Sequence, residues 1–351
     1  MRPLLQAAAR RNPPDTSLSA SVIVPFHHNL EFLERCLFAL ASRPGDVEVI
    51  VASDGAPQSC AALARRHGAR VVHLATCSGP AAARNRAAAS ASGEILIFVD
   101  ADVVVADGAL AALLTRFAEG EDIAAIFGSY DDDPRAQGFF SQYKNLAHAF
   151  VHRAAAGDVP TFWAGFGGVR ATVFRALGGF DETYTRPCIE DIELGRRLSA
   201  NGHRVLIDPR LRACHLKRWT FVSMVRSDVR DRGIPWTRLI LQSRHFPSTL
   251  NIDRSSRASV VLCWVGLICA ALAPVDRRLL VVSGLTLVAT FWMHRAFYEF
   301  LAVRRSRWFA LRGAAVHILY HVYNGVSFVV GAAGHVWTHG PKLAAHGPGS
   351  P

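Results

Sequence analysis

Two aspartates separated by a single residue follow a strongly apolar segment. Residues 94–99 read EILIFV, and Asp100 and Asp102 come directly after them. Carboxylates at positions i and i+2 past a buried strand can both reach a divalent cation, which itself bridges phosphate oxygens. The same pair would also suit an ordinary turn or a helix N-cap. Its position at a strand end favours a site for a metal ion and a phosphate.

An acidic pair and a histidine further along the chain are candidates for proton transfer and metal binding. Glu190 and Asp191 open an expected helix, where acidic side chains also suit the helix dipole. Asp191 could act as a general base that takes a proton from an acceptor hydroxyl. His215, in ACHLKRW, could ligate a metal beside a carboxylate, although a lone histidine is equally compatible with a structural role.

Further candidates lie at other strand ends. Pro25 ends the apolar run SVIVP, and Asp54 follows VEVIVA, where an Asp-Gly turn would also be ordinary. Arg84 lies on an expected helix after Gly79, and surface charge would explain it as well. The segment 163–168, WAGFGG, combines aromatic faces on which sugars stack with glycines that admit close approach, namely Gly165, Gly167 and Gly168. A turn in the core would use the same residues.

The elements that must position these residues alternate between strands and helices. We expect strands at 21–25, 47–52, 70–74, 94–99 and 123–129, with helices between them. This spacing predicts a parallel, doubly wound α/β sheet, which binds ligands beyond the carboxyl ends of its strands. Residues 130–220 are less regular, with helices expected at 139–154, 170–177 and up to residue 200, and a strand at 203–207.

The C-terminal third is apolar. Three stretches, 258–274, 279–293 and 313–337, approach the roughly 20 apolar residues that a membrane helix needs. We expect two or three spans, or alternatively a helical hairpin packed on a soluble domain. Residues 219–246 are amphipathic and rich in arginine, as in a helix lying along a membrane surface. The arginines of loop 294–312 favour a cytoplasmic position for that loop and for the N-terminal domain.

Composition excludes several classes. Half of the 351 residues are hydrophobic and 19% are charged, which excludes a disordered or fibrous protein. The net charge is +11, but the arginines gather at 204–238 and 295–312 while 94–133 is acidic, so we expect no nucleic-acid partner. No pair among the seven cysteines has metal or redox spacing, which favours a reducing compartment. The N-terminus shows no apolar stretch of signal-peptide length.

Taken in order, these motifs resemble the family 2 glycosyltransferases over about residues 20–220. The series is VIVP, SDG, GPAAARNRA, FVDAD, WAGFGG, GGFDE, IED and His215. The resemblance implies an α/β GT-A nucleotide-sugar-binding domain, Rossmann-like and with a mostly parallel sheet, followed by C-terminal transmembrane helices. The domains implied are 18–220 (catalytic), 221–257 (interfacial connector) and 258–337 (membrane region).

The resemblance also implies roles for the candidate residues. Pro25, Asp54 and Arg84 would line the nucleotide site, and Asp100 and Glu190 would belong to the nucleotide-sugar site as well. Gly165, Gly167 and Gly168 would form the loop that holds donor sugar and acceptor. Asp102 would bind Mn²⁺ or Mg²⁺ directly, with His215 as a further ligand of metal or diphosphate. Asp191 would be the catalytic base.

The implied reaction is a metal-assisted single displacement with inversion. A nucleotide-diphosphate sugar would be the donor, and a hydroxyl or phosphate of a membrane-linked acceptor, such as a lipid carrier or glycolipid, would receive the sugar. Membrane lipids would be further partners, and we expect a multi-pass inner-membrane protein. A processive polysaccharide synthase of the same family is an alternative, but the Q-x-x-R-W motif of those enzymes has only an imperfect match here, in RDRGIPW (230–236), so we favour transfer of a single sugar. A nucleotidyltransferase and a catalytically silent nucleotide-binding module are further alternatives.

Overall fold

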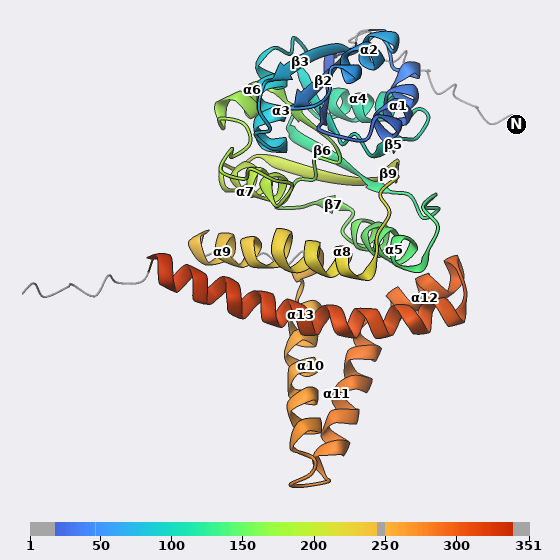
Figure 1. Cartoon of the computed structure of the whole chain (residues 1–351), viewed down its shortest axis with the longest axis vertical. Coiled ribbons are helices and arrows are strands. Elements are labelled where there is room, and N and C mark those ends of the chain that lie inside the picture. Colours follow the sequence, from blue (N-terminus) through green and yellow to red (C-terminus); the bar gives the residue numbers. More distant parts are fainter. Residues whose placement is uncertain (1–17, 46, 244–249, 340–351) are drawn as a thin grey trace, which may run out of the picture.

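The computed structural model describes residues 18–45, 47–243 and 250–339, which form a sheet domain above a group of C-terminal helices (Figure 1). The strands are β1 (Ala20–Phe26), β2 (Val47–Asp54), β3 (Arg70–Leu74), β4 (Ile95–Val99), β5 (Val103–Val105), β6 (Ile123–Tyr130), β7 (Gly157–Asp158), β8 (Phe166–Arg170) and β9 (Arg204–His215). The helices of the sheet domain are α1 (Leu30–Ala39), η1 (Leu40–Ser42), α2 (Ser59–Arg66), α3 (Pro80–Ala89), α4 (Ala109–Glu119), α5 (Phe139–Ala154), α6 (Ala171–Ala176) and α7 (Glu190–Ala200).

The sheet of the described residues has the strand order β3-β2-β1-β4-β8-β6-β9-β5, with β7 paired to β9. The strands β3, β2, β1 and β4 are parallel, as expected, and β6 also runs parallel to β9. The short or glycine-rich strands β5, β7 and β8 pair antiparallel with their neighbours. The parallel half therefore follows the sequence prediction, while insertion of β8 between β4 and β6 makes the whole sheet mixed.

Helices cover both faces of the sheet. On one face, apolar side chains of α1, α2 and α4 pack on alternate residues of β1, β2 and β4. On the other face, alanines of α3 together with α6 and α7 pack on the intervening residues. The alternation arises because successive side chains of a strand point to opposite faces. Both faces are buried, which explains the nearly continuous apolar runs of β1 and β4.

A third apolar cluster joins the sheet domain to the C-terminal helices. These are α8 (Phe221–Arg226), the π-helix η2 (Ser227–Gly233), α9 (Ile234–Ser243), η3 (Leu250–Ile252), α10 (Arg254–Leu272), α11 (Leu279–Met293), α12 (Arg295–Arg304) and α13 (Arg307–His339). Tyr143 and Leu146 of α5 pack in this cluster with Met224 of α8, Leu301 of α12 and Ala314 of α13. The connection is therefore apolar and holds α5 directly above the C-terminal helices (Figure 1).

The helices α10 and α11 form a hairpin that projects away from the sheet domain (Figure 1). Small residues face each other along the hairpin, and a Cβ added at Gly266 would lie 2.5 Å from the Thr286 hydroxyl. The outer faces expose large apolar side chains, such as Val281 and Trp292. Close packing through small residues with apolar groups turned outward is the pattern of helices in lipid. The hairpin does not pack on the sheet domain as the alternative prediction required.

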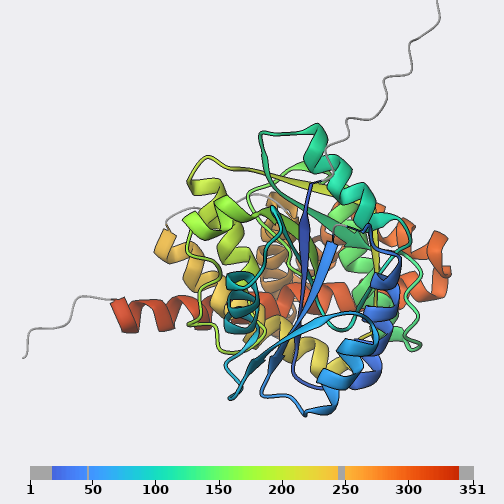
Figure 2. The same ribbon diagram turned by 90° about the horizontal axis from the view of Figure 1, so that it is seen from above.

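Two described helices are long and apolar enough to cross a membrane, Arg254–Leu272 and Arg307–Thr338, and α11 with α12 would add a third only as a span bent by 61°. The first span begins at Arg254, where the side chain of Asp253 accepts a hydrogen bond from the Ser256 amide at 2.8 Å. The helix α13 runs crosswise to the hairpin and lies beside α9, beneath the sheet domain (Figures 1 and 2). The three apolar stretches are therefore not three parallel helices.

Candidate active site

The carboxyl ends of β4 and β9 bring Asp102 and His215 together. Asp102 follows β4, and the next residue, Val103, begins β5 and lies opposite His215 in the antiparallel pair with β9. The Leu216 amide donates a hydrogen bond to the Asp102 carbonyl at 2.8 Å. The Nε2 atom of His215 lies 3.3 Å from Oδ2 of Asp102. The short strand β5, which the sequence did not predict, thus pairs the two expected metal ligands.

The environment of His215 suits a metal ligand. Its Nδ1 lies 3.1 Å from Oδ1 of Asn145 on α5, and its ring stacks on Tyr130 with centroids 4.6 Å apart. With Nδ1–H donating to Asn145, Nε2 keeps a lone pair directed at the Asp102 carboxylate. Two facing acceptors are satisfied by a shared cation, and metal-binding histidines characteristically donate their second N–H in this way. The donor set therefore fits a divalent metal ion.

The electrostatics of Asp102 support the same conclusion. Burial works to raise the pKa of this carboxyl, but the positive charge and the hydrogen bond of a protonated His215, together with the charge of Lys217, outweigh burial, so the pKa is lowered. A divalent cation between a neutral His215 and Asp102 would take the place of that positive charge. The side chain is consequently an ionised carboxylate, the form that a hard divalent cation binds.

Arg84 lies inside the site, enclosed by acidic partners. Its guanidinium donates to Oδ1 of Asp100 at 2.7 Å and to Oε1 of Glu190 at 2.8 Å, and the Arg84 side chain is only 5% exposed. The other oxygen of Glu190 accepts from the Cys188 amide at 2.9 Å. The three side chains form a buried network that ties α3, the end of β4 and the start of α7 together, and it holds Asp100 and Glu190 in fixed positions.

Asp191 lies in the first turn of α7, beside the glycine-rich segment. Its Oδ2 accepts from the Ala164 amide at 3.2 Å, and the next residue, Gly165, accepts from the Asp100 amide at 3.2 Å. Burial and the adjacent charge of Glu190 raise the pKa of Asp191 to about 6. A carboxylate with such a pKa is ionised at neutral pH and is a stronger base than an exposed aspartate.

The glycines of WAGFGG are packed by protein atoms. A Cβ at Gly165 would collide with the Trp163 ring, one at Gly167 would lie 2.5 Å from the Trp163 carbonyl, and one at Gly168 would lie 2.9 Å from the Phe117 ring. Gly167 and Gly168 belong to β8, between β4 and β6. Close packing of aromatic rings therefore explains the residue type at these positions, and the segment adjoins both Asp100 and Asp191.

Asp54 and Pro25 lie apart from this network, at the ends of β2 and β1. The Asp54 carboxylate accepts from the amides of Ser78 at 2.7 Å and Gly79 at 2.9 Å, which fixes the loop that leads into α3. Pro25 lies opposite Ala52 in the parallel pair of β1 with β2. Both residues are at the same sheet edge as Asp102, as expected from the parallel topology.

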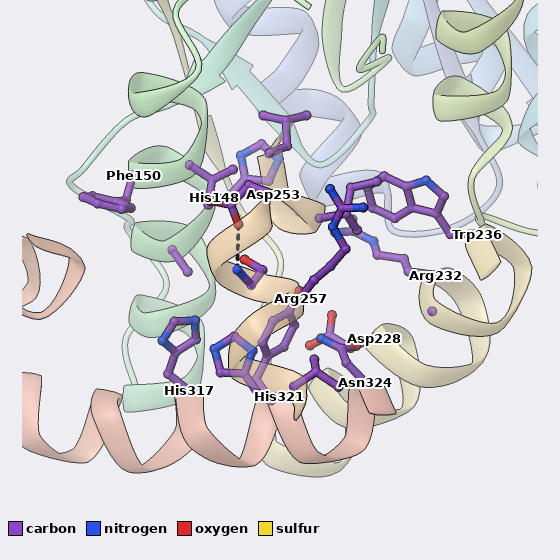
Figure 3. Close-up of a pocket in the computed structure, with 18 of the residues that line it drawn as sticks. His148, Phe150, Asp228, Arg232, Trp236, Asp253, Arg257, His317, His321 and Asn324 are labelled. Carbon is purple, nitrogen blue, oxygen red and sulfur yellow. Dashed lines mark hydrogen bonds between the residues drawn. The ribbon is translucent and has the colours of Figure 1, made fainter. Parts of the chain in front are cut away.

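A cavity of about 840 Å³ lies between α5 of the sheet domain and the C-terminal elements η2, α9, α10, α12 and α13 (Figure 3). Its wall carries three basic side chains, those of Lys144, Arg232 and Arg257, and three acidic ones, those of Asp158, Asp228 and Asp253. Phe150 and Trp236 line it with aromatic rings. Arg232 and Trp236 belong to RDRGIPW, a motif noticed in the sequence. No sequence pattern identified Lys144 or Asn145, the residue that contacts His215. Their contacts depend on how α5 packs against the sheet and the C-terminal helices.

A buried ion pair anchors the cavity wall. Lys144 of α5 pairs with Asp228 of η2, and the other oxygen of Asp228 accepts from the hydroxyl of Tyr323 of α13 at 2.8 Å. Asp228 is 5% exposed. Because both of its carboxylate oxygens have partners, Asp228 of the connector links Lys144 of the sheet domain to Tyr323 of α13.

Comparison with known proteins agrees with this geometry. Residues 21–178 match the domain described as "Glycosyl transferase family 2". Over 219 residues the chain is 28% identical to a validoxylamine A glucosyltransferase of Streptomyces hygroscopicus subsp. limoneus, covering 52% of this chain and 48% of the relative. Over 233 residues it is 27% identical to a pre-mycofactocin glycosyltransferase of Mycobacterium tuberculosis, covering 59% and 45%.

An O-antigen biosynthesis protein of Myxococcus xanthus is 28% identical over 228 residues, covering 58% of this chain and 18% of that protein. The chain thus spans about half or less of these relatives. Among solved structures, the mannosyltransferase PcManGT from Pyrobaculum calidifontis, in complex with GDP-Man and Mn²⁺, matches 93% of this chain and 89% of its own, with a TM-score of 0.54 and 18% identity. The sheet domain, which carries the matching residues 21–178 on a GT-A-type mixed α/β sheet, is a glycosyl transferase family 2 domain.

Proposed function

We propose that this protein is an inverting glycosyltransferase that uses a nucleotide-diphosphate sugar and a membrane-linked acceptor. The observation that carries the proposal is the placement of Asp102, His215 and Asp191 at one sheet edge. The helix α5 connects this edge to a cavity bordered by the apolar hairpin, because its Asn145 contacts His215 and its Lys144 lines the cavity. The donor would occupy the sheet edge, and the acceptor would approach from the cavity. Pro25, Asp54, Arg84, Asp100 and Glu190 are proposed to shape the nucleotide-sugar site, the last three through their buried network.

Asp102 and His215 are the residues that would hold Mn²⁺ or Mg²⁺. The ion would supply positive charge to the diphosphate as it leaves. The protein would bind the ion through the ionised carboxylate of Asp102 and the imidazole of His215, which Asn145 holds in place. The solved mannosyltransferase with GDP-Man and Mn²⁺ supports this proposal through its similar fold.

Asp191 is proposed as the general base for a hydroxyl acceptor. The acceptor oxygen would form a bond to the anomeric carbon while the bond from that carbon to the diphosphate breaks, and the hydroxyl proton would pass to Asp191. Attack on the face opposite the leaving group inverts the anomeric configuration. An acceptor phosphate arrives ionised and would need no base. The raised pKa of Asp191 suits proton transfer near neutral pH.

The cavity suits an amphiphilic acceptor. The guanidinium groups of Arg232 and Arg257 would attract a phosphate or other acidic head group, whereas Lys144 is already paired with Asp228. Aromatic and aliphatic residues such as Phe150 and Val260 would contact an apolar chain. The presence of Arg232 and Trp236 in the same wall keeps a processive synthase as the second candidate, because these residues carry the imperfect match to the synthase motif.

The hairpin α10–α11 is proposed to cross the inner membrane, with the catalytic domain in the cytoplasm. At about 1.5 Å per residue, α10 is about 28 Å long, close to the roughly 30 Å hydrocarbon core. The helix α11 is about 22 Å long, so the residues that flank it would complete its span. Asp276, Arg277 and Arg278 at the tip would lie in the opposite interface. The crosswise helix α13 would lie along the cytoplasmic surface, where Arg307 at its start would contact lipid phosphates.

The decisive experiment is hydrolysis and transfer with a panel of nucleotide sugars, using protein purified in detergent with lipid extract and Mn²⁺. We expect one donor to be consumed, with a glycolipid product seen by mass spectrometry. Asp102→Asn should lose metal-dependent turnover, and Asp191→Asn should bind the donor but lose transfer to a hydroxyl. A product bearing a long homopolymer would favour the synthase. Absence of donor binding by the wild type would contradict the proposal.

A further inference from the structure

Three histidines outside the proposed active site meet in the lower wall of the cavity. His294 lies at the break between α11 and α12, and His317 and His321 lie one turn apart on α13. One nitrogen from each ring lies within 4.8 Å of the others. The ring centroids are 4.5 Å apart for His317 and His321, 4.6 Å for His294 and His317, and 5.0 Å for His294 and His321. Figure 3 shows His317 and His321 side by side, pointing from α13 into the cavity.

The hydrogen bonds of two rings leave a nitrogen available on each. Nε2 of His294 lies 2.9 Å from the Ser259 hydroxyl, and Nδ1 of His317 lies 3.1 Å from the Tyr298 hydroxyl. A hydroxyl oxygen can accept the ring N–H, which then leaves a lone pair on the opposite nitrogen. This is the arrangement in which a second group orients a histidine that ligates a metal.

His321 supplies the independent observation. The residue is 0% exposed, and neither of its ring nitrogens has a hydrogen-bond partner among the described residues. A buried imidazole with both nitrogens unpaired is unfavourable, so a group is missing at one of them. The rings of His294 and His317 lie beside His321, and a cation bound by all three histidines would provide the missing partner for a nitrogen of His321.

We infer that His294, His317 and His321 form a second metal site, separate from the proposed site at Asp102 and His215, which takes a transition-metal ion of the Zn²⁺ type. Three imidazoles, two of them at i and i+4 on the helix α13, suit zinc, which is bound at tetrahedral sites by nitrogen and sulfur ligands. Mg²⁺ and Mn²⁺ prefer oxygen ligands, so they suit Asp102 better than this site. All three histidines line the cavity, from which water or an oxygen of a bound molecule would supply a fourth ligand.

The site would also brace the membrane region. His294 is the point at which the hairpin turns by 61° into α12, while His317 and His321 belong to the crosswise helix α13. One ion would therefore join the end of the hairpin to α13. This predicts that Zn²⁺ raises the thermal stability of the protein, since a ligand that binds only the folded state stabilises it.

The test uses full-length protein with a tag that contains no histidine, purified in detergent and treated with chelator. Asp102→Asn/His215→Ala removes the first candidate site, and Co²⁺ titration then reports the second through the visible absorption of tetrahedral cobalt. We expect one Co²⁺ per chain, displaced by Zn²⁺, with at least 10-fold weaker binding in His317→Ala and His321→Ala made on that background. His67→Ala, at the end of α2, is the matched control and should bind as its parent does.

A second variant separates ligation from packing. His321→Cys keeps a zinc ligand at the position but changes its shape, so Zn²⁺-dependent thermal stabilisation should return in His321→Cys and stay absent in His321→Ala. Metal uptake that is equal in His321→Ala and its parent would overturn the inference. So would a parent protein that binds no Co²⁺ or Zn²⁺ while remaining folded and monodisperse.

Discussion

Replacing the proposed base, Asp191→Asn, should make the protein more stable and less active at the same time. Burial and the charge of Glu190 raise the pKa of Asp191 from the ordinary 3.8 to about 6, so folding disfavours its ionised form. At about 1.36 kcal/mol per pKa unit, this rise corresponds to a cost of about 3 kcal/mol as an upper limit. Asparagine carries no charge and still accepts the hydrogen bond from the Ala164 amide, so the variant avoids that cost.

The sign of the pH dependence makes the prediction specific. The cost is absent below the unfolded-state pKa, near pH 4, grows as the pH rises, and is complete above about pH 6. The stability gain of Asp191→Asn should therefore be largest at pH 7–8, at about 1–3 kcal/mol, and disappear toward pH 4. Over the same range, transfer to a hydroxyl acceptor by the wild type should fall as the pH drops through 6.

The assay is thermal unfolding of wild type and variant in detergent, without nucleotide, at several pH values, together with turnover at neutral pH. Turnover should fall by about 10²–10⁴, the usual contribution of a general base. Asp181→Asn, in the exposed loop before α7, is a control that should change neither property. A variant that is less stable than the wild type at pH 7.5, or a gain that does not shrink toward pH 4, would refute the reasoning.

Three further predictions follow from other contacts. Asn145→Leu removes the partner that orients His215, so Mn²⁺ binding should weaken by about 10–100-fold, as measured by paramagnetic resonance of free Mn²⁺. Lys144→Met leaves Asp228 buried without its cation and should destabilise the protein by about 3–5 kcal/mol, seen as a lower melting temperature. Val275→Cys, 86% exposed at the hairpin tip, should react in intact cells with a membrane-impermeant maleimide.

For each of these predictions, a control variant distinguishes the proposed contact from a nonspecific loss of folding or activity. Asn145→Asp retains an acceptor for the His215 N–H and should bind Mn²⁺ better than Asn145→Leu. Lys144→Met combined with Asp228→Leu removes both charges and should recover part of the stability, and no recovery would show that the pair is not coupled. Phe38→Cys, exposed on α1, should stay unlabelled unless cells are opened, and equal labelling at both positions would contradict the proposed topology.

The sequence by itself predicted the parallel half of the sheet and the polar residues at its edge. Local apolar runs define β1, β2 and β4, because a strand buried on both faces must be apolar at nearly every position. The edge strand β3 is only partly buried and was predicted from a short apolar stretch. Once parallel strands are recognised, the residues after them lie at a common edge. This reasoning placed Asp54 and Asp102 at that edge. The helix α5 was also predicted with its observed bounds, since its apolar face has a helical period.

Tertiary structure alone decided how those residues are partnered. The strand β8 is built from glycines that pack under aromatic rings, so it carries no strand signal, and its antiparallel insertion could not be read from local pattern. The pairing of Arg84 with Asp100 and Glu190 joins residues up to 106 positions apart. The crosswise course of α13 and the meeting of His294 with His317 likewise depend on packing between distant helices. A sequence pattern reports the burial of each residue along its own element, whereas the neighbour that satisfies a buried polar group is chosen by the docking of separate elements.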